Sequence, residues 1–332
     1  MRLPDFEASG FFCLDFVIPD FNSPDFVRLP ICLDCDIELF ICGKIGKPID
    51  SLRGKVVWIT GASSGIGKSL GIVLARHGVK LCLSARREDE LDKVKSECLK
   101  KSESSLKPED IFVLKMDMLQ TDKHQDYFDQ VIKHFGRVDV LVNNAGRSQR
   151  ALWQNIDLQV DRELFDLDVF SVVNLSRIYI RHVEKHSLEG HIAVTSSTAG
   201  LIGVPNSCSY VGAKHAIHGY FDSLKLEIPD FNVTLFCPGP TTTDFLKTAF
   251  TDKTTEVYGG KAEASSKRMS SERCAFLMAT SIANKLHTSF VGPFPVPFLA
   301  YVSMYCPNLK LLILKLAGKG AMSKIRDPEK KD

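Results

Sequence analysis

The 332-residue chain has almost no net charge, because 42 Lys and Arg residues stand against 40 Asp and Glu and leave only +2 at neutral pH. A protein that binds nucleic acid through its phosphates needs a clear excess of basic residues, so this balance argues against a nucleic-acid partner. With 44% hydrophobic and 25% charged residues, the composition also excludes collagen, coiled-coil and disordered chains. The class that is left is a globular protein, and a chain of this length can bury a substantial core.

Cysteines are too few and too scattered for a disulfide framework. Ten of them lie between positions 13 and 306, which favours reduced thiols in a reducing compartment. One CxxC pair, Cys32 and Cys35, has neither a second pair nor a nearby His, and His215 and His218 have no Cys or carboxylate at ligand spacing. We therefore expect no metal site.

The first 50 residues lack a membrane span and a signal peptide. No uninterrupted apolar run there approaches the roughly 20 residues that cross a bilayer, and no basic segment precedes an apolar one. Residues 1–50 instead hold seven of the 21 Phe and five of the 15 Pro, and repeat the phrase PDF at Pro4, Pro19 and Pro24. Because proline breaks helices and central strands, we predict an irregular N-terminal extension whose apolar side chains lie on the body.

The other end, residues 291–332, forms a hydrophobic and basic C-terminal extension. Residues 286–309 contain no Asp, Glu, Lys or Arg, and four prolines interrupt them, which makes a spanning helix awkward. From Lys310 to the end there are seven basic and three acidic residues. Three interpretations stay open: a segment lying on a membrane surface, a wall of the substrate site, or a dimer contact.

The middle of the chain, residues 51–290, alternates apolar runs of strand length with amphipathic helical stretches. This order predicts a Rossmann-type, doubly wound parallel α/β sheet, in which ligands bind beyond the carboxyl ends of the strands. The expected strands are residues 55–60, 79–84, 111–116, 138–143, 191–196 and 232–237. The expected helices are residues 65–78, 88–103, 121–135, 157–186, 209–227 and 271–286.

The first predicted strand ends in the glycine-rich sequence TGASSGIG, residues 60–67, which opens the first helix. Its glycines permit a tight turn and a close backbone approach to a pyrophosphate, which the N–H groups of the helix N-terminus would bind. The spacing is GxxxGxG rather than the common GxGxxG. The candidate cofactor residues here are Thr60, Gly61, Ser63, Ser64, Gly65, Ile66 and Gly67.

The end of the second strand bears on cofactor preference. A site for NAD places an acidic residue there to bind the ribose hydroxyl, whereas this chain has Ala85 followed by Arg86, which suits a 2′-phosphate. NADP(H) is therefore favoured over NAD(H), although Arg86 and Arg87 could simply solvate the start of a charged helix. After the third strand, Asp117 is placed to accept from the adenine amino group or to cap the next helix.

Chemistry-bearing residues follow the fourth and fifth strands. The sequence NNAG supplies Asn143, Ala145 and Gly146 at the sheet edge, and Ser197 follows the fifth strand. Thirteen residues later, Tyr210 and Lys214 stand at i, i+4 on one helical face. A neighbouring cation favours the phenolate, so Tyr210 could exchange a proton with a carbonyl or alcohol oxygen.

TGASSGIG, NNAG, Ser197, YVGAK and CPGPTTT resemble the short-chain dehydrogenase/reductase family over roughly residues 51–290, and further stretches such as SARREDELDKVK resemble one subgroup of it. The resemblance implies hydride transfer between NADP(H) and an alcohol or carbonyl compound. It implies that Tyr210 is the general acid/base, that Lys214 assists Tyr210 and holds the nicotinamide ribose, and that Ser197 holds the substrate oxygen. It also implies that Asn143 lies on the adenosine side and that Pro238, Gly239 and Thr243 flank the nicotinamide.

The chain departs from the family at one helical position, where Asp168 replaces the usual Asn. The family's Asn is thought to act through its backbone carbonyl, which survives the change, while the side chain becomes an acceptor alone. We therefore expect catalysis with an altered pH optimum. The alternative is an NADP(H)-binding regulatory protein with weak or no turnover.

The predicted function is an NADP(H)-dependent oxidoreductase for a lipophilic substrate such as a steroid or retinoid. The resemblance is compatible with a homo-oligomer. The resembling subgroup is associated with the endoplasmic reticulum membrane through an apolar N-terminus, a pattern that residues 1–50 lack. Peripheral attachment to that membrane and a cytoplasmic location therefore both stay open.

Overall fold

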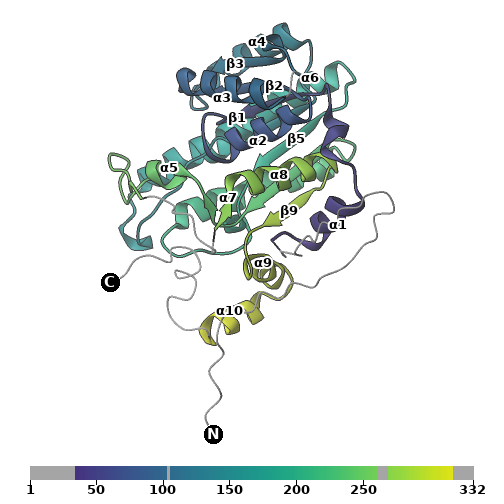
Figure 1. Cartoon of the computed structure of the whole chain (residues 1–332). Coiled ribbons are helices and arrows are strands. Elements are labelled where there is room, and N and C mark those ends of the chain that lie inside the picture. The colour runs from purple at the N-terminus through teal and green to yellow at the C-terminus, as the bar shows by residue number, and fades with distance from the viewer. Residues whose placement is uncertain (1–33, 103–104, 261–267, 317–332) are drawn as a thin grey trace.

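A computed structural model describes residues 34–102, 105–260 and 268–316. Its main feature is a seven-stranded parallel sheet in the order β3-β2-β1-β4-β5-β6-β9 (Figure 1). The strand order reverses between β1 and β4, which is where ligands bind in sheets of this kind. The strands are β1 Val56–Thr60, β2 Lys80–Ala85, β3 Ile111–Lys115, β4 Val140–Asn143, β5 His191–Thr195, β6 Asn232–Pro238 and β9 Thr288–Val291. A separate pair joins β7 Thr241–Thr242 to β8 Met269–Ser270.

The Rossmann-type fold is confirmed, and each of the six predicted strands is present within two residues at each end. The sequence analysis does not predict the seventh strand, β9, because its four residues are too short a run to stand out in the uncharged stretch that begins at residue 286. Since β9 pairs with β6 and ends at Val291, the sheet crosses the boundary expected between residues 290 and 291.

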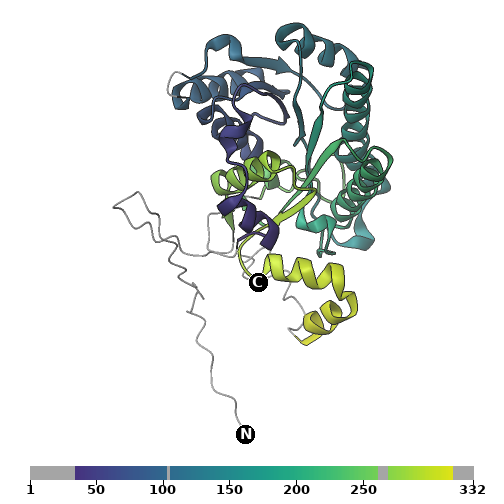
Figure 2. The same cartoon turned by 90° about the vertical axis from the view of Figure 1, so that its right-hand side faces the viewer.

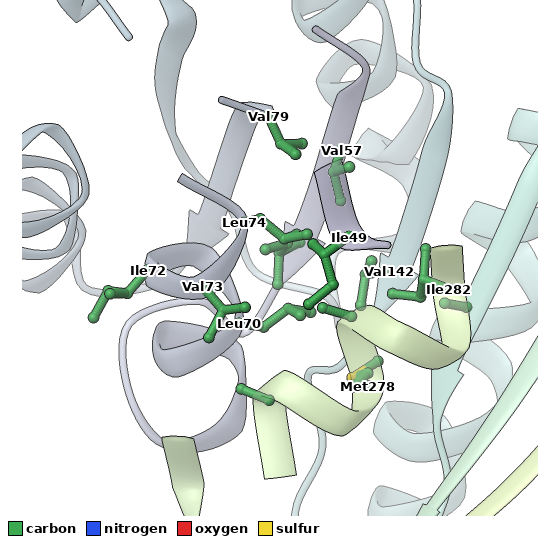
Figure 3. Close-up of a cluster of buried hydrophobic side chains, with 14 of the residues drawn as sticks. Ile49, Val57, Leu70, Ile72, Val73, Leu74, Val79, Val142, Met278 and Ile282 are labelled. Atoms are coloured by element: carbon green, nitrogen blue, oxygen red, sulfur yellow. The ribbon is translucent and has the colours of Figure 1, made fainter. Parts of the chain in front are cut away.

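Helices cover both faces of the sheet because successive strand residues point to opposite sides. Val57 and Ile59 pack toward α2 and α8, whereas Trp58 packs toward α4 and α6. Figure 3 shows the first of these cores, where α2 and α8 meet the strands. The helices on that face are α2 Gly65–Arg76, α3 Glu88–Lys101 and α8 Ser271–Ala283, and those opposite are α4 His124–Phe135, α5 Leu158–Phe165, α6 Ser171–Lys185 and α7 Cys208–Glu227.

Short helical segments connect these elements and bring several loops to the sheet edge. Five residues between α5 and α6, Asp166–Phe170, form a π-helix, a rare conformation that is frequent at functional sites. The 3₁₀ segments are Ile49–Leu52, Pro108–Asp110, Thr121–Lys123, Trp153–Asn155, Thr198–Gly200 and Asp244–Thr248.

The prediction of an irregular N-terminal extension is wrong for residues 37–45, which form helix α1, Ile37–Ile45. Asp36 begins this helix, because its carboxylate accepts hydrogen bonds of 2.8 Å from the N–H of Leu39 and from that of Phe290 in β9. Cys35 pairs antiparallel with Val291 and so covers the edge of the sheet. Burial raises the pKa of Cys35 to about 12. Cys32 and the three PDF repeats lie outside the described residues.

Two helices, α9 Val296–Tyr305 and α10 Pro307–Leu316, follow the sheet. Three of the four prolines that argued against a spanning helix lie at helix starts, where a missing N–H costs no hydrogen bond: Pro295 caps α9, Pro297 lies in its first turn and Pro307 begins α10. Within the described part of the chain, every helix is too short or too polar to cross a membrane.

Candidate active site

A cavity of about 850 Å³ lies at the carboxyl ends of the strands, around the point where the strand order reverses. Residues that are distant in the sequence meet there, and most of the predicted site residues are among them. Those on the cavity wall are Thr60, Gly61, Ser63, Ser64, Gly65, Ile66, Arg86, Asp117, Ala145, Gly146, Ser197, Tyr210, Lys214, Pro238, Gly239 and Thr243. Gly67, Asn143 and Asp168 are not among the lining residues.

The glycine-rich turn packs directly against the NNAG segment. Gly61 has φ +66°, and a Cβ there would lie 2.8 Å from the Cα of Ala145, so only glycine permits this approach. A Cβ on Gly67 would likewise lie 2.4 Å from the amide nitrogen of Asn144. These glycines therefore serve the contact between β1, β4 and α2, while the N-terminus of α2 remains at the cavity wall.

Asn144, which the sequence analysis did not single out, holds this corner together. Its amide donates to the carbonyl oxygens of Thr60 at 3.0 Å and Gly61 at 3.2 Å, and its Oδ1 accepts from Thr195 Oγ1 at 3.1 Å. Asn143 instead is buried and donates to Ser176 Oγ at 3.0 Å. Side chains alternate across a strand, so the second Asn of NNAG, and not the first, reaches the cavity.

Two arginines and a helix N-terminus give the part of the cavity beside β2 a cationic character. Arg86 is exposed at the cavity wall, and Arg87 donates from Nη2 to Ser63 Oγ at 3.1 Å, across the glycine-rich turn. Arg87 therefore does more than solvate a helix. Together with the free N–H groups at the start of α2, this donor set fits the phosphates of a dinucleotide.

Asp117 does not cap the next helical segment, Thr121–Lys123, which begins after Gln120, and its role toward adenine stays a prediction. It lies on the cavity wall, and its Oδ1 accepts from the N–H of Leu119 at 3.1 Å in the turn before the next helical segment. Its carboxylate is thereby oriented by the backbone.

Tyr210 and Lys214 lie on one face of α7, with Lys214 Nζ 5.5 Å from the centre of the Tyr210 ring. Both side chains are buried except where they meet the cavity, and Phe245 packs edge-on against Tyr210. Ser197 follows β5, where its hydroxyl donates to Pro238 O at 3.3 Å and accepts from the N–H of Ala199 at 3.1 Å. A phenol, an ammonium and an oriented hydroxyl therefore share one wall.

Asp168 contacts Lys214 directly. Within the π-helix its carboxylate is completely buried, with Oδ2 3.1 Å from Lys214 Nζ and Oδ1 accepting from the N–H of Arg147 at 2.8 Å. Lys214 also donates to Thr195 O at 3.2 Å. The sequence analysis expected an altered pH optimum from Asp168 but not this contact, because spacing does not show that two helices turn these side chains toward each other.

In the Asp168–Lys214 pair, burial and mutual attraction shift the two pKa values in opposite directions. Burial raises the pKa of Asp168 above its ordinary value, and the attraction of Lys214 only partly offsets that rise. Burial also depresses the pKa of Lys214, but the Asp168 carboxylate and the Tyr210 hydroxyl outweigh it and raise that pKa overall. The ammonium thus stays charged in a dry environment, with part of its field directed at Asp168 rather than Tyr210.

A doubly wound sheet, a glycine-rich turn at its crossover and a Tyr/Lys pair beside the turn define a Rossmann-type oxidoreductase. The family model described as short chain dehydrogenase matches residues 55–254, and the chain belongs to that family. The fold of this family binds a nicotinamide cofactor.

Curated relatives agree with this assignment. The chain is 38% identical over 279 residues to the mouse dehydrogenase/reductase SDR family member 7, covering 83% of this chain and 81% of the relative, and this is the subgroup that the motifs indicated. It is also 29% identical over 262 residues to the 11-beta-hydroxysteroid dehydrogenase-like 2 of Arabidopsis thaliana, covering 78% of this chain and 80% of the relative.

Solved structures show the same fold at lower identity. An alcohol dehydrogenase from Thermococcus sibiricus, complexed with 5-hydroxy-NADP, matches at 22% identity with a TM-score of 0.63, covering 73% of this chain and 97% of that one. A short chain dehydrogenase/reductase from Burkholderia phymatum, in complex with NAD, matches at 20% identity with a TM-score of 0.65, covering 79% of this chain and 96% of that one.

The buried ion pair yields a prediction about stability. Lys214→Met leaves the Asp168 carboxylate buried and unpaired, so the free energy of unfolding should fall by about 3–5 kcal/mol at pH 7, as for other broken buried pairs. The double variant Lys214→Met/Asp168→Leu should lose clearly less free energy of unfolding than Lys214→Met, because it leaves no buried charge. Urea titrations of both variants, of Asp168→Leu and of the parent complete the cycle.

The same cycle has a pH dependence whose sign follows from the raised pKa of Asp168. In folded Lys214→Met the carboxyl should be neutral near pH 4, and the destabilisation should grow as the pH rises from the unfolded pKa of about 3.9 to the higher folded pKa, above which it levels off. A pH-independent loss, or losses that simply add in the double variant, would contradict a buried ion pair.

Proposed function

We propose that the protein is an NADP(H)-dependent oxidoreductase that interconverts a lipophilic alcohol and its carbonyl compound. The observation that carries this proposal is the placement of Ser197, Tyr210 and Lys214 on one wall of a cavity that also holds the glycine-rich turn. Apolar side chains line part of the same cavity, which suits a lipophilic substrate: Ile202, Val204, Phe245, Leu246, Val296 and Leu299. The Arabidopsis relative's name refers to a hydroxysteroid, a compound of this class.

In this proposal the chain's own residues bind the substrate oxygen and move a proton. The nicotinamide, when bound, supplies or accepts the hydride. The Ser197 hydroxyl, which accepts from the N–H of Ala199, turns its one hydrogen from Pro238 O to the carbonyl oxygen of the bound substrate and polarises that carbonyl. Tyr210 gives its O–H proton to that oxygen during reduction and removes it again during oxidation. Lys214 stabilises the phenolate that reduction leaves behind.

The preference for NADP(H) rests on Arg86 and Arg87 at the cavity and on Ala85 at the place where an acidic residue would favour NAD(H). A guanidinium binds a phosphate with two parallel hydrogen bonds, which a ribose hydroxyl cannot match. The solved relatives include both cofactor types, so the chain's own residues decide the proposal.

Asp168 supports a second candidate function, a cofactor-binding regulatory protein. The carboxylate lies 3.1 Å from Lys214 and takes up part of the ammonium's charge, which leaves less to stabilise the Tyr210 phenolate. A site with a weakened base binds its cofactor and turns over slowly. The two candidates differ in the effect of restoring Asn at this position.

Tyr210→Phe should lower turnover by about 10² to 10⁴, the usual contribution of general acid/base catalysis, because the proton is lost while the ring still packs on Phe245. Cofactor binding, followed by titrating the fluorescence of NADPH, should persist. Tyr220→Phe, on the exposed part of the same helix, is the matched control and should keep parental turnover. Near-normal turnover in Tyr210→Phe would remove this residue from the mechanism.

Arg86→Asp places a carboxylate where we infer a 2′-phosphate, so NADPH binding should weaken at least tenfold while NADH binding holds or improves. Titrations of both cofactors against the parent measure the change. Arg181→Asp, on the exposed side of α6, introduces the same charge change away from the cavity and should leave both affinities unchanged. Equal losses for the two cofactors would instead assign Arg86 a folding role.

Asp168→Asn removes the carboxylate and leaves the Lys214 charge to act on Tyr210 alone. The phenolate becomes easier to form, so the pH profile of alcohol oxidation should move to lower pH, with the maximal rate within a few-fold of the parent. Asp166→Asn, on the same π-helix but exposed, should leave the profile unchanged. An unmoved profile would contradict this electrostatic account, and a large gain in turnover would favour the regulatory protein.

A further inference from the structure

Helices α9 and α10 lie together at one end of the molecule, with α10 farther from the sheet than α9 (Figures 1 and 2). Exposed side chains on these helices and just before them form an apolar surface. We call it the C-terminal apolar surface, and its most exposed side chains, Leu316, Tyr305 and Phe294, are 78%, 74% and 73% exposed. Helix α1 adjoins it, because the N–H of Ile37 donates to Tyr301 Oη at 3.1 Å. The surface comprises Phe294, Phe298, Met304, Tyr305, Leu309, Leu311, Leu312 and Leu316.

Helix α10 shows most plainly that this surface needs a partner. Six of its ten residues are Leu or Ile, yet none of its residues is buried. A helix of ten residues is marginal in water by itself, and contiguous exposed apolar patches of this kind mark interaction surfaces. The free energy gained by covering these side chains is therefore available to a partner.

The charges around the surface identify the chemistry of that partner. Lys310 and Lys315 are the charged residues of α9 and α10, and the sequence contains no Asp or Glu between positions 273 and 326. Apolar side chains whose charged neighbours on α9 and α10 are cations alone match a bilayer with anionic headgroups, although the adjoining α1 also carries the exposed Glu38. A two-fold contact with a second copy would face each lysine with the same cationic surface and supply no carboxylate from it.

We propose that the C-terminal apolar surface docks on an anionic lipid bilayer, with its Leu and aromatic side chains entering the headgroup region and its lysines facing lipid phosphates. This proposal does not depend on the reaction. It does place the cavity close to the lipid, because Val296 and Leu299 on the inner side of α9 line the cavity while Phe294 and Phe298 face outward. One helix, about 10 Å thick, then separates lipid from the cavity.

The test is flotation of the full chain, without detergent, on vesicles of phosphatidylcholine alone or mixed with phosphatidylserine. The parent should float with the mixed vesicles, and Leu311→Glu/Leu312→Glu should lower the partition coefficient at least tenfold by placing charge in the headgroup region. Lys310→Gln/Lys315→Gln should lose the preference for phosphatidylserine. Leu226→Glu, at an 82% exposed position near the end of α7, is the matched control and should float like the parent.

Circular dichroism and thermal unfolding show whether each variant keeps the parental fold. A parent that fails to float, and whose dimer in sedimentation is abolished by Leu311→Glu/Leu312→Glu, would overturn the proposal in favour of a second copy of the chain. A monomer that fails to float would show that the surface stays open or is covered from within the chain. Equal flotation of parent and Leu311→Glu/Leu312→Glu would place the lipid contact elsewhere, residues 1–33 included.

Discussion

The buried ammonium of Lys214 is the charge around which the candidate active site is arranged. Removing an ion of this size from water costs several kcal/mol even after the protein relaxes, so its neighbours must compensate for lost hydration. They do so from three elements: Thr195 O at the end of β5, Asp168 in the π-helix and the Tyr210 ring one turn away on α7. The position of the ammonium is thus defined by the junction of a strand and two helices.

Asp168 changes how that charge is shared. A neutral amide at this position would leave the ammonium to act chiefly on Tyr210, whereas a carboxylate 3.1 Å away divides its field between two partners. The same carboxylate binds the N–H of Arg147, which follows NNAG directly, so it also anchors the loop beside the glycine-rich turn. One side chain therefore couples the electrostatics of the Tyr210–Lys214 pair to the backbone beside the glycine-rich turn.

Helix α9 connects the cavity with the outer surface. Its inner residues line the cavity, its outer residues belong to the C-terminal apolar surface, and Tyr301 joins it to α1. Asp36, at the start of α1, binds the backbone of β9. The edge of the sheet, the N-terminal helix and the apolar surface are consequently parts of one packed unit.

The sequence alone determined the parallel sheet, six of its strands and the helices between them, because apolar periodicity and turn residues are local properties of the chain. The sequence also predicted most of the residues that line the cavity, because they follow the strands and the carboxyl ends of parallel strands share one edge of the sheet. The roles of those residues remain predictions.

Only the tertiary structure decided which side chains meet across elements. Asp168 reaches Lys214, Arg87 reaches Ser63 and Asn144 replaces Asn143 at the cavity because side-chain direction depends on how strands and helices are packed. The sequence analysis also did not predict β9 and α1, because a four-residue strand and a short helix have weak sequence patterns of their own. Both are stabilised by mutual contact, in which Asp36 caps α1 and binds β9.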